Sequence, residues 1–502
     1  MVQTLFSFRC LRGGACPLLL FAGCVVTPDR SLLEREGGPS AVDLRAEGAD
    51  LAVDGPVPDA PMPPDGFRAD VVGPGGTIPV YRSVGPGNTQ PLSQGATSKA
   101  SLTVAGPLAT FSAAQPDRVG VGDVVQYDLN GDGIISEKDA VAIIHQRYSA
   151  TQFAVRTGTS GVPRPVLGAS TWSVYRAYTA VADAVTGTEN IGIQSSVRDF
   201  DSWSGGRDLV TGKLTWNIAC YADAPETRPV LVSGWLTSST HRLRIFAPVG
   251  PELVGTSQRH TGKAGGGFVI RTRKASHAVD IASDNVTLEG LEIAEWVNDG
   301  DNTSYEGIHV AADGVLLADL VVHDEDYSAV PNPNGDAINL NGMKAGHRVT
   351  IRNCAIYNVS RGAINYQGSE AIEVEVESCS IDQTGLTLAQ ADGEGGISIK
   401  GTAAKVTVVN TISVGSGGGL DFKSPSGWGS SSNNISSDDS APGSGSLTLT
   451  KPVDLFLSSG ADLHLVSGAS AVGQGKDLSS RFTNDFDGQT RSDPWDIGAD
   501  ER

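Results

Sequence analysis

The sequence is poor in the residues that build disulfide frameworks and long helices. Its 502 residues include only 6 Cys and 3 Met, and aromatic residues make up 6%. Beyond residue 24 the cysteines are Cys220, Cys354 and Cys379, an odd number without clustered spacing. This excludes a disulfide framework, so we expect small buried thiols. Glycine is abundant by contrast, at 62 residues, which favours short strands joined by many turns.

Basic charge is also scarce. Lys and Arg number 37 against 57 Asp and Glu, which gives a net charge of -20. A polyanion would be repelled, so we expect no nucleic-acid partner. The length permits two or three domains, and 39% hydrophobic residues is enough for a sizeable core.

The N-terminus contains no apolar run long enough to span a bilayer as a mature helix. Arg9 and Arg12 precede the short apolar stretch "PLLLFAGC", which is typical of an export signal over residues 1–24. The stretch resembles a bacterial lipoprotein box, with Phe21 where Leu is usual. The resemblance implies lipidation of Cys24 and a protein anchored to a membrane at the bacterial outer membrane or cell surface; plain secretion is the alternative.

Two further regions precede the main body of the chain. Residues 25–77 contain "VDGPVPDAPMPPDG", whose Pro, Asp and Gly without periodicity predict an extended tether. Residues 78–204 alternate polar and apolar side chains, as in "VGVGDVVQYD", which predicts a small β-rich domain. Within it, "WSVYRAYTAVADAV" (residues 172–185) is predicted to form one amphipathic helix.

The rest of the chain is repetitive. Four stretches, "NVTLEGLEI", "GVLLADLVV", "RVTIRNCAI" and "EVEVESCSI", carry apolar residues at offsets 0, 2, 5 and 7 from Val286, Val315, Val349 and Val374. A second set of short strands interleaves with them: "GIHV", "AINL", "AINY", "GISI" and "GLDF". Self-similarity at intervals of about 25 to 35 residues predicts a solenoid.

The repeats lack the fixed Leu/Asn consensus of leucine-rich repeats and the four strands per unit of a propeller. The remaining fit is a mainly β fold, a right-handed parallel β-helix over residues 205–502, whose coils stack about 4.8 Å apart. Cys354 should then lie directly above Cys379. The chain resembles the pectin-lyase-like β-helix proteins of bacterial surfaces, with "WNIACYADAPE" similar to their opening segment and "FDGQTRSDPWDIGADE" to their closing segment. That resemblance implies a fold and names no reaction.

The stretch "DLNGDGIISEKD" spaces oxygen-bearing residues as a calcium loop does, with Gly133 at the sharp turn. It resembles the loop of an EF-hand or of one dockerin repeat. The resemblance implies a Ca²⁺ cofactor held by Asp128, Asn130, Asp132, the carbonyl of Ile134, Ser136 and Asp139. The stretch before it is strand-like and no second loop follows. We expect a stabilising metal site rather than an active site; a solvated turn between two strands is the alternative.

The interleaved strands predict a polar strip on the outside of the helix. Their outward residues should be His309, Asn339, Asn365, Ser398 and Asp421, followed by Ala311, Asn341, Gln367, Lys400 and Lys423. Leu420 and Phe422 should point inward. The carboxylates of Glu306, Asp336 and Glu394 precede the strands.

This strip supplies candidate catalytic residues (Glu306, His309, Asp336, Lys400) and candidate substrate-binding residues (Asn339, Asn365, Asp421, Lys423). A polysaccharide lyase would use Lys400 or Lys423 as base, with Glu306 and Asp336 holding a metal. A glycoside hydrolase would use two carboxylates, Asp336 with Glu306 or Glu394. A merely solvated face is the alternative. The long stretches "VNDGDNTSYEG" and "HDEDYSAVPNPNGD" lie beside the strip, where binding loops are usual.

Two functions therefore remain open. One is a surface protein that binds or degrades extracellular polysaccharide, as a lyase or a hydrolase. The other is a non-catalytic surface, adhesion or stalk protein that calcium stabilises.

Overall fold

The computed structural model describes residues 76–201, 203, 205–273, 276–296, 305–325, 335–386 and 395–502. The chain divides into two compact units, Met1–Phe67 and Arg68–Arg502, and the described residues belong to the second. Cys24 and nearly all of the tether lie outside the described residues. Within the described part, none of the helices has the length and apolar character needed to cross a membrane.

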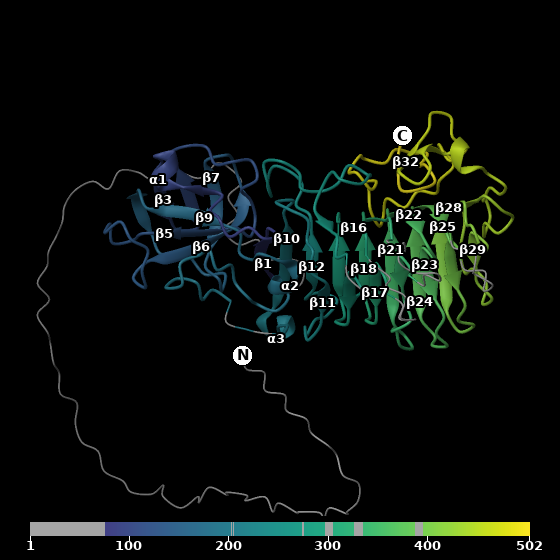
Figure 1. Ribbon diagram of the computed structural model, residues 1–502, viewed down its shortest axis with the longest axis horizontal. Coiled ribbons are helices and arrows are strands. Elements are labelled where there is room, and N and C mark those ends of the chain that lie inside the picture. Colours follow the sequence, from purple (N-terminus) through teal and green to yellow (C-terminus); the bar gives the residue numbers. More distant parts are fainter. Residues whose placement is uncertain are drawn as a thin grey trace, which may run out of the picture. The chain divides into compact units, whose positions relative to one another are not determined.

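Three parallel sheets form the main body (Figure 1). The first sheet holds, in spatial order, β1 (Ile78–Val84), β10 (Leu214–Cys220), β12 (Leu243–Phe246), β15 (Val286–Glu289), β18 (Val315–Ala318), β21 (Arg348–Arg352), β24 (Glu373–Glu377) and β27 (Lys405–Val409). The second sheet holds β13 (Val269–Ile270), β16 (Glu292–Ala294), β19 (Val321–His323), β22 (Ala355–Val359), β25 (Ser380–Thr384), β28 (Ile412–Val414) and β30 (Ile435–Ser436). The third sheet holds β11 (Val230–Val232), β14 (Val279–Ile281), β17 (Ile308–Val310), β20 (Ile338–Asn339), β23 (Ile364–Tyr366), β26 (Ile397–Ile399) and β29 (Phe422–Lys423).

From β12 to β29, successive strands enter the first, second and third sheets in turn, so one turn of the chain is one coil. Every neighbouring pair within these sheets is parallel. This is the parallel β-helix that the repeats predict. Strand β1 falls within the range predicted for the small domain, yet it pairs with β10 along its whole length as the edge of the first sheet.

Each apolar repeat is two strands separated by a bend. The bend residues Asp319, Asn353, Ser378 and Asn410 have φ of 56°, 49°, 49° and 53°. Few residues other than Gly enter this left-handed region readily, and Asp and Asn are the commonest of them. The bend therefore breaks the alternation after offset 2, so that the next apolar residue appears at offset 5.

Stacked aliphatic side chains fill the interior. Ile308, Ile338, Ile364 and Ile397 occupy one ladder and are fully buried. Cys220, Cys354 and Cys379 are free and buried, as expected. Because Arg352 pairs with Glu377, Cys354 and Cys379 occupy equivalent positions of neighbouring coils.

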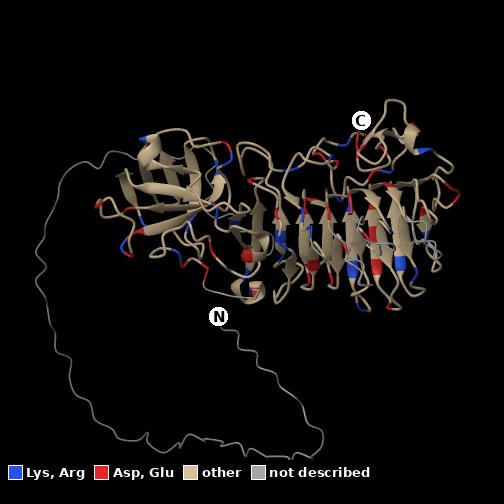
Figure 2. Cartoon of the chain, in the orientation of Figure 1, with Lys and Arg blue, Asp and Glu red and all other residues tan. Residues whose placement is uncertain are grey.

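The outer face of the first sheet carries a row of alternating charge. Glu373 lies 2.5 Å from Arg348 and 3.3 Å from Lys405 on the two flanking strands. Figure 2 shows these alternating basic and acidic patches on neighbouring strands. All three side chains are at least one-third exposed, so each pair adds little stability.

Residues 93–175 form an eight-stranded antiparallel sheet in the order β2 (Ser93–Gln94), β9 (Trp172–Tyr175), β5 (Val124–Tyr127), β6 (Ala140–Arg147), β7 (Gln152–Arg156), β4 (Leu108–Phe111), β3 (Leu102–Ala105) and β8 (Val166–Ala169). The predicted helix over 172–185 is wrong. Its first part is strand β9, whose Trp172 and Val174 alternate into the core, and only Val181–Ala184 (α2) is helical. The other helices described are α1 (Gly95–Ser98), α3 (Leu209–Gly212) and a 3₁₀ turn (Pro452–Asp454).

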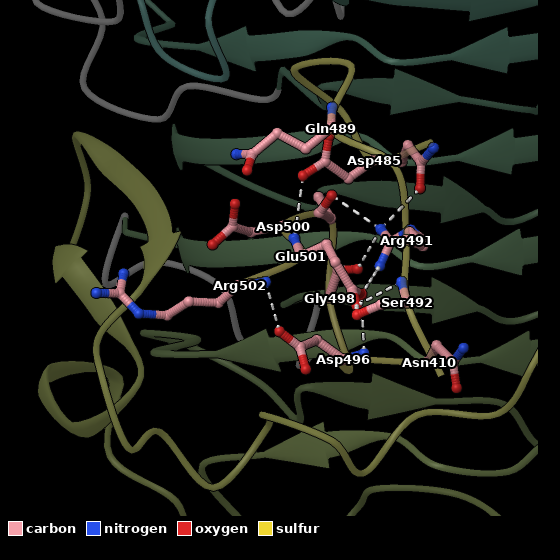
Figure 3. A network of polar contacts seen from close by, with 12 residues as sticks. Asn410, Asp485, Gln489, Arg491, Ser492, Asp496, Gly498, Asp500, Glu501 and Arg502 are labelled. Carbon is pink, nitrogen blue, oxygen red and sulfur yellow. Dashed lines mark hydrogen bonds and ion pairs between the residues drawn. The ribbon is translucent and has the colours of Figure 1, made fainter. Parts of the chain in front are cut away.

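Residues 455–502, here called the C-terminal segment, cover the outer face of the second sheet. The segment contains the hairpin β31 (Phe456–Ser458) and β32 (Asp462–Leu465), and it packs apolar side chains against Tyr357, Ile412 and Val414. Arg491 anchors it: its Nη2 donates to the Asn353 side-chain oxygen at 3.0 Å, and its Nη1 lies 3.3 Å from Glu501 (Figure 3). The segment is therefore fastened to a bend residue of the helix.

Candidate functional site

The links between the second and third sheets differ greatly in length. Link 360–363 joins β22 to β23 directly, whereas links 295–307, 324–337 and 385–396 in neighbouring coils are long. All four residues of the short link are buried, and long connections commonly carry binding residues. The candidate site lies around this short link.

Two acidic side chains occupy equivalent positions there. Glu306 and Asp336 each stand two residues before a strand, and these strands pair Ile308 with Ile338. The backbone N–H of Asp336 donates to Glu306 Oε2 at 2.5 Å. The side-chain amide of Asn339 donates to Glu306 Oε1 at 3.2 Å and to Asp336 Oδ2 at 2.8 Å, so one nitrogen bridges the two carboxyl groups.

The two carboxyl groups have different surroundings. Asp336 also accepts from the Gly362 N–H at 3.0 Å and the Asn365 amide at 2.7 Å, and Arg361 Nη1 lies 3.9 Å away. Burial raises the pKa of both groups, and the charge of Asp336 raises the pKa of Glu306 further, well above its ordinary value. Donors and the guanidinium favour charge on Asp336. Of the two groups, Glu306 is therefore the one whose neutral form the surroundings favour more.

A histidine pair lies beside the acids. The backbone N–H of Glu306 donates to His277 Nδ1 at 3.1 Å, which leaves the neutral ring's proton on Nε2. His277 stacks on His309 with ring centres 4.8 Å apart. His309 Nδ1 is 2.9 Å from Asp280. Burial and the neighbouring His309 lower the pKa of His277, while the hydrogen bond with His309 lowers the pKa of Asp280.

The strip is less solvated than a surface strand would be. Asn339, Asn365 and Ser398 point out of the apolar interior, yet each is at most 3% exposed. The next rung is accessible: Asn341 and Gln367 are exposed, and Asn341 accepts from the Gln367 backbone N–H at 2.6 Å. The site thus combines a buried row of polar side chains with a neighbouring row that is exposed to solvent.

Two of the predicted positions are wrong. Strand β29 pairs Phe422 with Ile397, a shift of two residues from the expected register. Leu420 is consequently 44% exposed rather than inward. Asp421 is buried outside the strip, where its carboxylate accepts from the backbone and hydroxyl of Ser437. The sequence prediction aligned the glycines of "GLDF" and "GISI". In the structure Phe422, which is bulkier than Leu420, occupies the core position next to Ile397.

The lysines lie away from the acidic pair. Lys423 shares a rung with Ser398, and Lys400 follows the end of β26 whereas Asp336 precedes β20. Five residues along a strand and two coils across place the backbone of Lys400 roughly 15 Å or more from that of Asp336. The two residues therefore belong to different parts of the strip. Glu394 lies outside the described residues, as do most of both long stretches beside the strip.

Sequence reasoning missed four polar residues of the site: His277, Asp280, Glu325 and Arg361. A signal existed for two of them, because His277 aligns with Glu306 and Asp280 with His309 once the coils are in register. Glu325 accepts from the Ser360 N–H at 2.8 Å, and its charge contributes to the raised pKa of Glu306.

The calcium-like loop joins β5 to β6 without an entering helix. Asp128 accepts three backbone N–H groups of the loop, from Asn130, Gly131 and Gly133, at 2.8 to 3.0 Å. Asp139 accepts from Leu129 and Ser136. Over the described ranges, no three or more His, Cys, Asp or Glu side chains are arranged to hold a metal ion. In this conformation the carboxylates of Asp128 and Asp139 accept hydrogen bonds from backbone N–H groups of the loop, and calcium binding stays a prediction.

No protein-family model matches the chain, and no curated protein does. Among solved structures, the chain is similar to pectate lyase Pel9A, with 13% identity and a TM-score of 0.29 over 57% of this chain and 88% of that one. It is also similar to the tailspike of Acinetobacter baumannii bacteriophage AP22, solved with capsular saccharide (9%, TM-score 0.17), and to that of Pseudomonas phage LKA1 (10%, TM-score 0.13). The chain spans 59% and 62% of these tailspikes. Likeness at this level transfers no activity.

Proposed function

We propose that the chain is a glycoside hydrolase that acts on a polysaccharide, with Glu306 as general acid and Asp336 as general base. The observation that carries this proposal is the bridged pair of carboxyl groups whose surroundings separate their protonation states. Glycosidic cleavage requires one protonated and one ionised carboxyl group, and this pair would supply both.

The lysine positions favour hydrolysis over elimination. A lyase needs its base within reach of the carbon next to a uronate that the metal neutralises. Lys400 lies too far from Glu306 and Asp336 to share one sugar unit with them. Hydrolysis needs only the acidic pair and water.

The accessible edge of the site suits a polymer. Asn341 and Gln367 repeat once per coil, and Lys400 continues the same row one coil further on. Amide groups at the coil spacing present donors and acceptors at a repeat close to one sugar unit. An extended polysaccharide lying along the helix would therefore meet a regular series of hydrogen-bonding groups.

A second candidate function is a non-catalytic stalk, and the burial of the acids favours it. Asp336 is fully buried, and its hydrogen bonds with Gly362 and Asn365 join its own coil to the next one. In that case the pair would be a structural device and the exposed row at most a glycan-binding edge.

The two functions separate in one experiment. Wild type, Glu306→Gln and the surface control Glu373→Gln are incubated with a panel of polysaccharides, and released reducing ends are measured together with the absorbance of unsaturated product. The hydrolase predicts reducing ends without unsaturated product, from wild type and control but not from Glu306→Gln. Unsaturated product would point to a lyase, and no release with intact folding would favour the stalk.

A further inference from the structure

Two buried polar atoms beside Asp336 lack hydrogen-bond partners. Asn365 and Ser398 are neighbours on one rung of the third sheet, and both are fully buried. Within the described part of the chain, neither Asn365 Oδ1 nor Ser398 Oγ has a partner. The Asn365 amide nitrogen already donates to Asp336 Oδ2 at 2.7 Å, so its oxygen cannot exchange places with it without facing a carboxylate.

Such atoms need an explanation, because buried polar groups are nearly always hydrogen-bonded. The amide oxygen only accepts, whereas a serine hydroxyl both donates and accepts. A group that satisfies both atoms must donate one hydrogen bond and make a second one. Water does this, and waters in protein interiors typically bridge otherwise unsatisfied polar groups.

We propose that Asn365 Oδ1 and Ser398 Oγ bind one water molecule beside Asp336, and that this is the water consumed in the hydrolysis. The binding site stands on the two unpartnered atoms; only the chemical role rests on the proposed function. In the reaction, an O–H bond of the water breaks and its proton passes to Asp336. The oxygen forms a bond to the anomeric carbon, the glycosidic C–O bond breaks, and the proton of Glu306 passes to the leaving oxygen.

The backbone at the short link fits this role. A Cβ on Gly362 would lie 3.1 Å from Asp336 Oδ1 and 3.3 Å from the Cβ of Asn365. Any side chain there would press on both Asp336 and Asn365. Glycine keeps the backbone N–H close enough to donate to Asp336 at 3.0 Å.

The first test is a high-resolution crystal structure of the wild-type chain without ligand. We expect a solvent peak within hydrogen-bonding distance of both Asn365 Oδ1 and Ser398 Oγ, and its loss or displacement in Ser398→Ala. A wild-type structure with no such peak would overturn the inference. So would a complex in which a sugar hydroxyl takes this position while the ligand-free protein has no solvent there.

The second test concerns the role. Ser398→Ala should lower kcat roughly tenfold to hundredfold with KM nearly unchanged, because the water is misplaced rather than the sugar. The matched control is Ser378→Ala, which removes a buried hydroxyl that also has no partner among the described residues but lies in the bend between the first two sheets. Its kcat should stay at the wild-type value. Equal kcat values for Ser398→Ala and Ser378→Ala would show that the proposed water has no catalytic role. A bound water in a wild type that hydrolyses nothing would contradict the proposed function and leave the binding inference standing.

Discussion

Asn339 fixes how the proton is shared between the two acids. Its side-chain oxygen accepts from the Asn341 backbone N–H at 2.9 Å, so its amide nitrogen must face Glu306 and Asp336. A single donor shared by two carboxyl groups stabilises the ionised form of only one of them at a time. Asp336 takes the charge because Gly362 and Asn365 give it two further donors.

This arrangement predicts unequal tolerances to amide substitution. Both oxygens of Glu306 accept hydrogen bonds, so Glu306→Gln turns its new NH2 group towards one donor, and the free energy of unfolding at pH 7 should fall by about 1 kcal/mol. Asp336→Asn places an amide among three donors and should cost about 1–3 kcal/mol. Chemical denaturation of both variants checks this. Equal losses would mean that the charge is not on Asp336.

The raised pKa of Glu306 also predicts a pH dependence. A carboxyl group whose pKa is raised by folding contributes stability that is fully present below its unfolded pKa and is lost as the pH rises towards its folded pKa. Wild type should therefore lose up to about 1.4 kcal/mol per pH unit above the unfolded pKa, relative to Glu306→Gln. Denaturation curves between pH 4 and 8 give the slopes. Parallel slopes for the two proteins would contradict the assignment.

At the scale of elements, the C-terminal segment depends on a charged histidine. His464 Nδ1 lies 2.5 Å from Asp462, and its Nε2 lies 3.5 Å from Asp487. Burial lowers the pKa of His464, but the hydrogen bonds with Asp487 and Asp462 outweigh it and raise the pKa to about 9. The pKa of Asp485, in the same segment, is raised to about 7, so its contribution to stability is also lost as the pH rises.

The docking of this segment should consequently weaken between pH 7 and 9. The stability that His464 contributes is fully present below its unfolded pKa and disappears as the pH rises through about 9. Hydrogen exchange at Leu463 and Leu465, in β32, should accelerate over this interval after correction for the intrinsic rate. In His464→Gln the protection should be low already at pH 7 and nearly constant. Wild-type protection that does not change from pH 7 to 9 would show that the histidine is not charged.

The loop between β5 and β6 carries the calcium prediction. If Ca²⁺ binds there, the ion should raise the melting temperature of wild type, because a ligand that binds only the folded state stabilises it. Asp128→Ala should remove the effect by deleting a charged ligand. The control Asp117→Ala removes a largely exposed acid from the same domain and should retain it. Identical melting temperatures of wild type with calcium and with chelator would show that the loop is a turn that does not bind calcium.

The sequence predicts the interior better than the site. The apolar offsets at Val349 and Ile351, then at Cys354 and Ile356, identify both strands of a coil because core positions repeat in every coil. The residue types of the outward polar strip do not repeat from coil to coil, because they depend on link lengths and on partners in other coils. The register error at Phe422 and the missed His277 have this common cause. The strand at Trp172 was missed because its apolar spacing also satisfies a helix, and only sheet neighbours decide between them.

At the scale of the whole molecule, the export prediction can be tested apart from the fold. Cys24 lies outside the described residues, and its lipidation remains a proposal from the sequence. Cys24→Ser should move the protein from the membrane fraction to the soluble exported fraction, since the acyl chains would supply the membrane affinity. Fractionation of cells that express both forms measures this. Unchanged partitioning would reject the lipid anchor.

The account depends most on the claim that Glu306 and Asp336 form a working acid–base pair rather than a structural one. The most direct measurement is the rate of reducing-end release from a responsive polysaccharide by wild type and Glu306→Gln, both shown to be folded at pH 7. We predict that Glu306→Gln loses at least about a hundredfold in kcat while it remains folded, because the acid is needed only in the transition state. Full activity in folded Glu306→Gln would contradict the central claim.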